Sequence, residues 1–360
     1  MKHLSKLLRK VKLFIKEKRV NFRKWKLYKS MTPGIKLKKL TKEQTKIIQQ
    51  YYKEHTGKKI NTRWHQYYYS LNDTFTPQYI PLELYHSKII PELNHTSMSK
   101  AYADKNFSDI LFPEILHPRN IIKNINGFFY RNGKPISREE AIKICSNLEN
   151  VFIKYAIDTS WGMNVYKFSS QNGISTVEGK TINDLFNYYN KNFLVQESVI
   201  QHPILAKLNP TSVNTIRLTT YRREVEVVCV SAVVRIGGKD AVIDNVSAGG
   251  VYCGIDANSK LKKYSFAIKP SGKYIQSPTG VVLAGYEIPF YKKILEKAKE
   301  MHLKLPYCRI VGWDFSVNEN EEIVLIELNA NHTGVYQLVE PAFGNYTDEI
   351  LNMIRSKKNA

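Results

Sequence analysis

The sequence predicts an α+β protein that carries a basic helical extension at its N-terminus. Two observations support this fold class. Apolar residues recur at helical spacing in the first part of the chain, whereas from residue 125 onward short apolar runs alternate with turn residues, as strands do. The chain has 360 residues, of which 43% are apolar, so it can bury the core of one large domain or of two to three smaller ones.

Changes in composition divide the chain into five predicted segments. A Pro-punctuated stretch between Pro77 and Pro91 places the first boundary near residue 75, and strand-like texture begins at residue 125. The segments are 1–75, a basic helical extension; 76–124, the start of the main module; 125–200, a first α+β subdomain; 201–348, a second subdomain with long strands; and 349–360, a C-terminal helix.

The formal charge of +22 is concentrated near the N-terminus, where twelve lysines and arginines between Lys2 and Lys29 face Glu17 as the one acidic residue. Apolar residues among them recur at helical spacing, which predicts an amphipathic basic helix. They are Leu4, Leu7, Leu8, Val11, Phe14 and Ile15.

This basic helix has three possible roles: to lie on an anionic membrane surface, to bind nucleic acid, or to pack on the folded body. Nucleic acid is the weakest of the three, because the charge is local and no recognised nucleic-acid motif accompanies it. Charges interrupt every apolar run, which excludes a secretion signal or a membrane span in this segment. We expect a cytoplasmic protein that is peripheral on the inner leaflet if the helix binds membrane. The four scattered cysteines predict neither zinc nor a disulfide framework.

The first α+β subdomain is expected to begin with a hairpin at 126–134. Ser137 and Glu140 then form a capping pattern for a helix that ends near Leu148. A strand at 151–157 leads through a loop at 158–164 to a strand at 165–168. Lys154 lies inside this apolar strand and needs an anionic partner or an exposed edge, so it is a candidate phosphate ligand. The loop after it contains one glycine, which favours an ordinary hairpin turn over a phosphate-binding loop.

The elements that follow are a helix at 181–190, a strand at 193–200, and long strands at 213–221 and 225–236. Arg217 and Arg235 lie within these long apolar strands, where a buried guanidinium requires phosphate or carboxylate. The alternative is a structural salt bridge to Asp244 or Glu226. A helix is predicted from Pro289 through Met301, and a last one at 348–355.

Two apolar runs near the C-terminus, 311–317 and 323–329, flank a polar break at 318–321 and predict a β-hairpin. A short loop centred on the break pairs positions whose numbers sum to 639. Since side chains alternate along strands, Asp314, Glu327 and Asn329 then share one face. The opposite face carries Trp313, Phe315, Val317, Val324, Ile326 and Leu328.

Two carboxylates and an amide on one face of an apolar hairpin repel one another unless a cation lies between them, and Mg²⁺ prefers such oxygen ligands. The alternative is an exposed hairpin whose acidic residues face water.

In order along the chain, these features resemble the ATP-grasp superfamily and, within it, the sugar-transfer-associated branch. The resemblance covers about residues 100–345. It rests on Asp104-Lys105, Asn126 to Tyr130, Ser212 to Arg217, Asp244-Asn245 with Gly249-Gly250, Pro278-Thr279-Gly280, Gly285, Ile288-Pro289, Gly312-Trp313-Asp314 and Glu327-Leu328-Asn329.

The resemblance implies an ATP-grasp fold in which two α+β subdomains, a nucleotide-binding lid at 125–200 and a catalytic, metal-binding part at 201–348, clamp ATP. It also implies roles for single residues. Phosphate or nucleotide contacts fall to Lys105, Lys154, Gln196, Glu197, Ser198, Val199, His202 and Asn245; transition-state charge to Arg217 and Arg235; and Mg²⁺ to Asp314, Glu327 and Asn329. For His202, a solvated turn before Pro203 is an equal alternative.

The implied activity is that of a Mg²⁺- and ATP-dependent carboxylate-amine ligase acting through an acylphosphate, with sugar-linked or small carboxylate and amine substrates of surface polysaccharide synthesis. One departure favours an alternative. Many ATP-grasp proteins have proline and several glycines after the phosphate lysine, whereas here Tyr155 follows Lys154 and the loop contains Gly162 alone. The alternative is a non-catalytic binding protein of ATP-grasp fold at the inner membrane surface.

Overall fold

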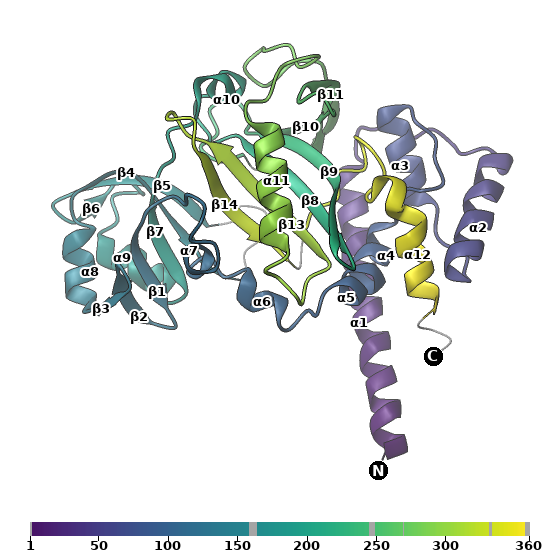
Figure 1. The fold of residues 1–360 in the computed structure, drawn as a ribbon, viewed down its shortest axis with the longest axis horizontal. Coiled ribbons are helices and arrows are strands. Elements are labelled where there is room, and N and C mark those ends of the chain that lie inside the picture. Colours follow the sequence, from purple (N-terminus) through teal and green to yellow (C-terminus); the bar gives the residue numbers. More distant parts are fainter. Residues whose placement is uncertain (1, 158–163, 245–248, 269, 331–332, 357–360) are drawn as a thin grey trace.

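The computed structural model describes residues 2–157, 164–244, 249–268, 270–330 and 333–356 (Figure 1). Two seven-stranded antiparallel sheets lie side by side, and a helical layer borders the second sheet on the side away from the first. The prediction of an α+β fold with a helical N-terminal segment is therefore confirmed.

The helical layer comes mostly from the first third of the chain. It contains α1 (Lys2–Met31), α2 (Lys42–Thr56), α3 (Arg63–Asn72), the continuous run α4 (Leu82–Leu84), η1 (Tyr85–Ile89) and α5 (Ile90–Leu93), and the C-terminal α12 (Thr347–Ser356). The short helices α6 (Ser99–Tyr102) and α7 (Ser108–Leu111) lead from this layer to the first sheet. The first half of α1 projects beyond the body (Figure 1). No helix in the described part of the chain has the length and apolarity that a bilayer crossing needs.

The first sheet has the strand order β3-β2-β1-β7-β4-β5-β6. Its strands are β1 (Asn120–Ile125), β2 (Phe128–Arg131), β3 (Lys134–Ile136), β4 (Leu148–Tyr155), β5 (Val165–Gln171), β6 (Ile174–Ser175) and β7 (Phe193–Glu197). Helices α8 (Arg138–Ile144) and α9 (Ile182–Tyr189) supply its core, in which Phe186 packs on Phe193. In β4, Val151 and Ile153 enter this core, so Lys154 points to the opposite face.

The second sheet has the order β12-β11-β10-β9-β8-β13-β14. Its strands are β8 (Thr215–Arg223), β9 (Glu226–Ile236), β10 (Val251–Ile255), β11 (Leu261–Ile268), β12 (Ser271–Tyr274), β13 (Ile310–Val317) and β14 (Ile323–Asn329). Helices α10 (Pro203–Leu208) and α11 (Tyr291–His302) pack on one face, with Trp313 and Phe315 beneath them. β14 forms the edge nearest the first sheet (Figure 1).

Residues of the N-terminal extension share a core with this second sheet. Ile48 and Tyr52 of α2 lie in one buried cluster with Tyr221 of β8, Ile310 of β13 and Ile350 of α12. Of the three roles predicted for the N-terminal region, packing on the body is therefore realised where α1 ends, because Met31 is buried beside Trp64.

Several predicted element ends need correction. Helix α8 is capped by Ser137 as predicted but ends at Ile144, since Leu148 already belongs to β4. The predicted strand 193–200 ends at Glu197. Helix α11 begins at Tyr291 because Phe290 has a left-handed backbone (φ 59°), so Pro289 lies before the helix rather than opening it.

The hairpin register also differs from the expected sum of 639. Asp314 faces Glu327 and Trp313 faces Leu328, but a bulge follows, and Phe315 faces Leu325. Because of the bulge at Ile326, Leu325 rather than Val324 joins the core cluster that contains Phe315, and Val324 is buried outside that cluster. The prediction that Asp314, Glu327 and Asn329 share one face is correct, because the pairs Asp314–Glu327 and Gly312–Asn329 both precede the register shift.

Candidate active site

The polar face of the second sheet collects charged side chains from four neighbouring strands. Strand pairing places Asp314 beside Glu327 on one side and beside Arg217 on the other, and places Thr215 beside Arg235. Directly opposed residues of antiparallel strands point to the same face, so these side chains converge by register alone.

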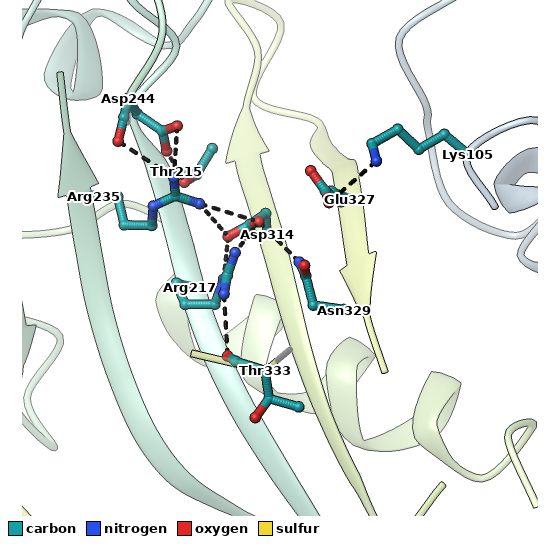
Figure 2. Close-up of polar contacts among 9 residues, drawn as sticks. All are labelled: Lys105, Thr215, Arg217, Arg235, Asp244, Asp314, Glu327, Asn329 and Thr333. Atoms are coloured by element: carbon teal, nitrogen blue, oxygen red, sulfur yellow. Dashed lines mark hydrogen bonds and ion pairs between the residues drawn. The ribbon is translucent and has the colours of Figure 1, made fainter. Parts of the chain in front are cut away.

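At the centre of this face, Arg217 donates two hydrogen bonds to Asp314, from Nε and Nη2 to the two carboxylate oxygens (Figure 2). Both side chains are buried, with 6% and 2% of their surfaces exposed. Arg235 Nη1 lies 3.4 Å from each Asp314 oxygen, and Asn329 Nδ2 donates to Oδ2 at 3.3 Å. Asp314 is thus the common acceptor of the group.

A second carboxylate stands behind Arg235. Asp244 Oδ1 lies 3.2 Å from Arg235 Nη2, and Thr215 Oγ1 donates to its other oxygen. The predicted alternative of a salt bridge from Arg235 to Asp244 is therefore present, together with the contact to Asp314. The Arg235 Nε–H is buried and has no acceptor among the described residues.

The pKa values of the two carboxyls move in opposite directions. Burial works to raise the pKa of Asp314, but the charges of Arg217 and Arg235 outweigh it and hold that pKa below the usual range. Burial raises the pKa of Asp244, and Arg235 offsets this only in part. Asp314 is therefore the more firmly ionised group of the two.

A crevice separates β14 from the first sheet and contains the other two predicted phosphate-binding cations, Lys105 and Lys154. Lys105, Lys154 and Gln196 line it from one side and Glu327 from the other. Lys105 Nζ is 3.3 Å from Glu327 Oε1 and bridges the crevice (Figure 2). Burial, and then the charge of Lys105, lowers the pKa of Lys154 to about 8 although Glu327 and Asp314 act to raise it. The cations are thus crowded together.

Other predicted nucleotide contacts lie farther along the chain. Gln196 donates to the carbonyl of Pro118, and Glu197 pairs with Arg119. Ser198 donates to the carbonyl of Asn150, and Val199 is half-buried just after β7. Gln196 and Glu197 end β7 and Ser198 and Val199 follow it, and three of these four side chains already make local contacts.

Two predicted nucleotide contacts remain, His202 and Asn245. His202 Nδ1 accepts from the backbone N–H of Ile204 and caps α10, so the turn alternative describes its observed contact. It is not among the residues that line the crevice. Asn245 lies outside the described residues.

Sequence reasoning missed the group that anchors Arg217 from the far side, the backbone carbonyl of Thr333, which accepts from Nη1 at 3.1 Å (Figure 2). The signal was Gly312. A Cβ at this position would lie 2.6 Å from the Thr333 carbonyl oxygen, so the glycine lets that segment lie directly on the sheet. Further residues that line the crevice and were not predicted as site residues include Tyr102, Ser108, Asp109, His117 and Asn120.

A family model of sugar-transfer-associated ATP-grasp proteins matches residues 85–343. Among solved structures, a D-alanyl-alanine synthetase A from Vibrio cholerae is 13% identical over 71% of this chain and 65% of its own, with a TM-score of 0.42. The VanG D-Ala:D-Ser ligase from Enterococcus faecalis is 14% identical over 71% and 61%, with a TM-score of 0.40.

A biotin carboxylase from Campylobacter jejuni is 12% identical over 70% of this chain and 46% of its own, with a TM-score of 0.41. The chain therefore spans less than two thirds of the length of each of these three proteins. No curated protein matches the chain significantly. The match over residues 85–343 contains both sheets and every described residue of the crevice and the ion-pair group. By this match the chain is a member of the sugar-transfer-associated ATP-grasp family.

Proposed function

We propose that this protein is an ATP- and Mg²⁺-dependent ligase that joins a carboxylate to an amine. The observation that carries the proposal is that a crevice lined by Lys105, Lys154 and Glu327 adjoins a polar sheet face on which ion pairs gather. On that face Arg217 and Arg235 contact Asp314, and Arg235 also contacts Asp244.

The charges favour a polyanionic ligand. Asp314 and Asp244 are engaged by the two arginines. On the crevice side, Lys105 lies 3.3 Å from Glu327, and Lys154 is close enough to Lys105 for the charge of Lys105 to lower its pKa. Burial and the charge of Lys105 lower the pKa of Lys154, which shows that the two lysines repel each other. An anion bound between them would relieve this repulsion. The triphosphate of ATP has the charge and the oxygen acceptors to do so.

The oxygen donors fit Mg²⁺. Glu327 and Asp314 are adjacent carboxylates, and Asn329 donates to Asp314 through its amide nitrogen, which leaves its amide oxygen available as a ligand. Mg²⁺ is usually held by one or two carboxylates together with substrate phosphates, as this donor set permits. When bound, the ion would neutralise charge on the β- and γ-phosphates.

The chemistry we propose is activation of a carboxylate. An oxygen of the substrate carboxylate forms a bond to the γ-phosphorus of ATP as the bond to ADP breaks, giving an acylphosphate. The amine nitrogen then bonds to the acyl carbon, phosphate leaves, and the nitrogen loses a proton. Arg217 and Arg235 stabilise charge on the transferring group, and the Arg235 Nε–H, buried and without an acceptor among the described residues, is a donor still to be used.

The family suggests the substrate class. Its description as sugar-transfer-associated favours a sugar-linked or small carboxylate and an amine that enter a surface polysaccharide or sugar conjugate. The alternative function is a binding protein that keeps the fold without turnover, favoured by the single glycine of the loop after Lys154.

ADP release in the presence of Mg²⁺ and mixtures of amines with uronic or amino acids tests the proposal. Asp314→Asn and Glu327→Gln should each abolish release, whereas Glu319→Gln, an equivalent change on the exposed hairpin loop, should not. Unchanged release in the first two variants would contradict the metal assignment. Nucleotide binding without any release by the unaltered protein would favour the binding-protein alternative.

We also propose that the protein is cytoplasmic and peripheral, with residues 1–30 lying on an anionic membrane surface. Leu8, Val11, Phe14 and Ile15 of α1 are exposed by 45% to 60%. Aromatic residues of α1 are followed four residues later by a lysine whose ammonium group lies over the aromatic ring. Lys18 Nζ, for example, lies 5.3 Å from the centroid of the Phe14 ring. Such pairs place an apolar ring beside a cation, as interfacial helices do.

Vesicle flotation tests this association. Phe14→Ser with Ile15→Ser should reduce flotation with anionic vesicles. Phe128→Ser with Ile174→Ser, which changes two somewhat more exposed apolar residues of the first sheet, should leave flotation intact. Equal flotation of both double variants would refute membrane binding by α1.

A further inference from the structure

A groove lies on the far side of the molecule from the crevice, where α1 leaves the body. It has a volume of about 560 Å³ and is lined by α1, the α2–α3 connection, the α4–η1 run and α12. It lies outside the part of the chain in which we place ATP, and most of its lining precedes residue 85, where the family match begins.

The lining combines apolar side chains with a basic rim. Phe22, Trp25, Ile60, Leu84 and Ile354 supply the apolar part. The charged lining residues are Lys18, Lys58, Lys59, Arg63 and Lys88 against Glu17 and Glu83. The two glutamates are engaged in ion pairs, Glu17 with Lys88 and Glu83 with Arg63 at 2.8 Å, so the lining keeps an excess of three positive charges.

One wall of the groove has an uncommon backbone. Residues Tyr85–Ile89 form a π-helical turn between α4 and α5, and such turns are found frequently at functional sites. Tyr85 and Ile89 are buried in the body, whereas Ser87 and Lys88 line the groove. The wall is therefore fixed from behind and offers small and cationic side chains to the cavity.

An anionic amphiphile matches this surface better than a macromolecule does. A second copy of the chain would bring another net charge of +22 against a basic rim. Nucleic acid has no flexible apolar chain to cover Phe22, Trp25 and Ile60. The apolar surface of the groove is also continuous with α1, because Phe22 and Trp25 belong to both and are exposed by 55% and 41%.

We propose that this groove binds one anionic phospholipid, with an acyl chain against Phe22, Trp25 and Ile60 and the phosphate beside Lys58 and Lys59. The site extends the proposed membrane association of α1 and rests on it for access to lipid. A lipid held here would fix the angle between α1 and the body and so the distance of the crevice from the membrane.

The direct test is native mass spectrometry of the full chain with phosphatidylglycerol, compared with phosphatidylcholine and with glycerol phosphate. We expect one phosphatidylglycerol per chain. Ser87→Phe, which fills the groove, and Lys58→Glu with Lys59→Glu, which reverses charge at two exposed positions, should each weaken it on the order of tenfold. Lys292→Glu with Lys293→Glu, an adjacent exposed pair on α11, is the matched control and should bind normally.

Two results separate this proposal from membrane binding by α1. The variant with Phe14→Ser and Ile15→Ser should show reduced vesicle flotation and still bind phosphatidylglycerol in the mass spectrometer, since neither residue lines the groove. Phosphatidylglycerol bound at the normal level by both groove variants would overturn the proposal, as would equal binding of phosphatidylcholine or of glycerol phosphate alone. Because Lys58 and Lys59 are exposed, the charge reversal tests the site even if Ser87→Phe fails to fold.

Discussion

Arg217 and Asp314 are the residues on which the polar face depends most. Each is almost fully buried, and each meets the other through two hydrogen bonds. A buried ion pair contributes little net stability, but removal of one partner leaves an uncompensated buried charge. The pair therefore holds the site in shape more than it stabilises the fold.

We predict that Arg217→Met lowers the free energy of unfolding by roughly 3–5 kcal/mol, because among the described residues Asp314 then keeps the longer contacts to Arg235 and Asn329. The double variant with Asp314→Leu should recover most of this loss. Urea denaturation of the single and double variants measures both values. A loss below about 1 kcal/mol in Arg217→Met would show that Arg235 replaces its partner.

Lys154 gives a prediction on pH. Its pKa in the free protein is about 8 owing to burial and Lys105, and bound phosphates raise it. Between these two pKa values, binding takes up a proton, so ATP affinity should be constant below pH 8 and fall as the pH rises above it. Calorimetric titration in buffers of different ionisation enthalpy detects the proton. Lys154→Arg, which stays protonated, should remove the pH dependence, and a pH dependence that persists would assign the proton elsewhere.

Among the elements, the hairpin of β13 and β14 shows which features the alternation of side chains along a strand can predict and which it cannot. Alternation placed Asp314, Glu327 and Asn329 on one face because these residues lie on the same side of the bulge. The bulge at Ile326 was not predictable from alternation, since an extra residue obeys no period. The start of α11 was missed for a similar reason, because the left-handed backbone of Phe290 is set by its surroundings and not by the preference of phenylalanine.

At the same hairpin we predict that Gly312→Ala displaces the Thr333 carbonyl from Arg217. The added Cβ would meet backbone atoms at 2.6–3.2 Å, which cannot rotate away. Overpacking of this kind costs about 1–3 kcal/mol. The temperature of thermal unfolding and the rate of ADP release should both decrease in Gly312→Ala. The control is Gly127→Ala, in an open turn of the first sheet. Its backbone strain (φ 96°) should lower stability but leave ADP release by the folded fraction unchanged. Normal ADP release by Gly312→Ala would refute a role for the Thr333 carbonyl.

At the scale of the whole molecule, the helical layer and the second sheet share their core. Leu351 of α12 is fully buried in the cluster that contains Ile48, Tyr52 and Tyr221. We predict that Leu351→Ala costs about 2–5 kcal/mol and shifts the unfolding of the helical layer and of the second sheet together. Hydrogen exchange of α2 and β8 checks this. Faster exchange confined to α2 would show that the layer unfolds separately.

The sequence by itself determined the fold class, the family, and the face that unites Asp314, Glu327 and Asn329, because these depend on local periodicity and on motifs contiguous in the chain. Only the tertiary structure decided that Arg217 and Arg235 share Asp314, that Lys105 reaches Glu327 across the crevice, and that helices of the first third complete the core. Those contacts join residues far apart in sequence, and their geometry is set by strand order and by close packing, which no local pattern encodes.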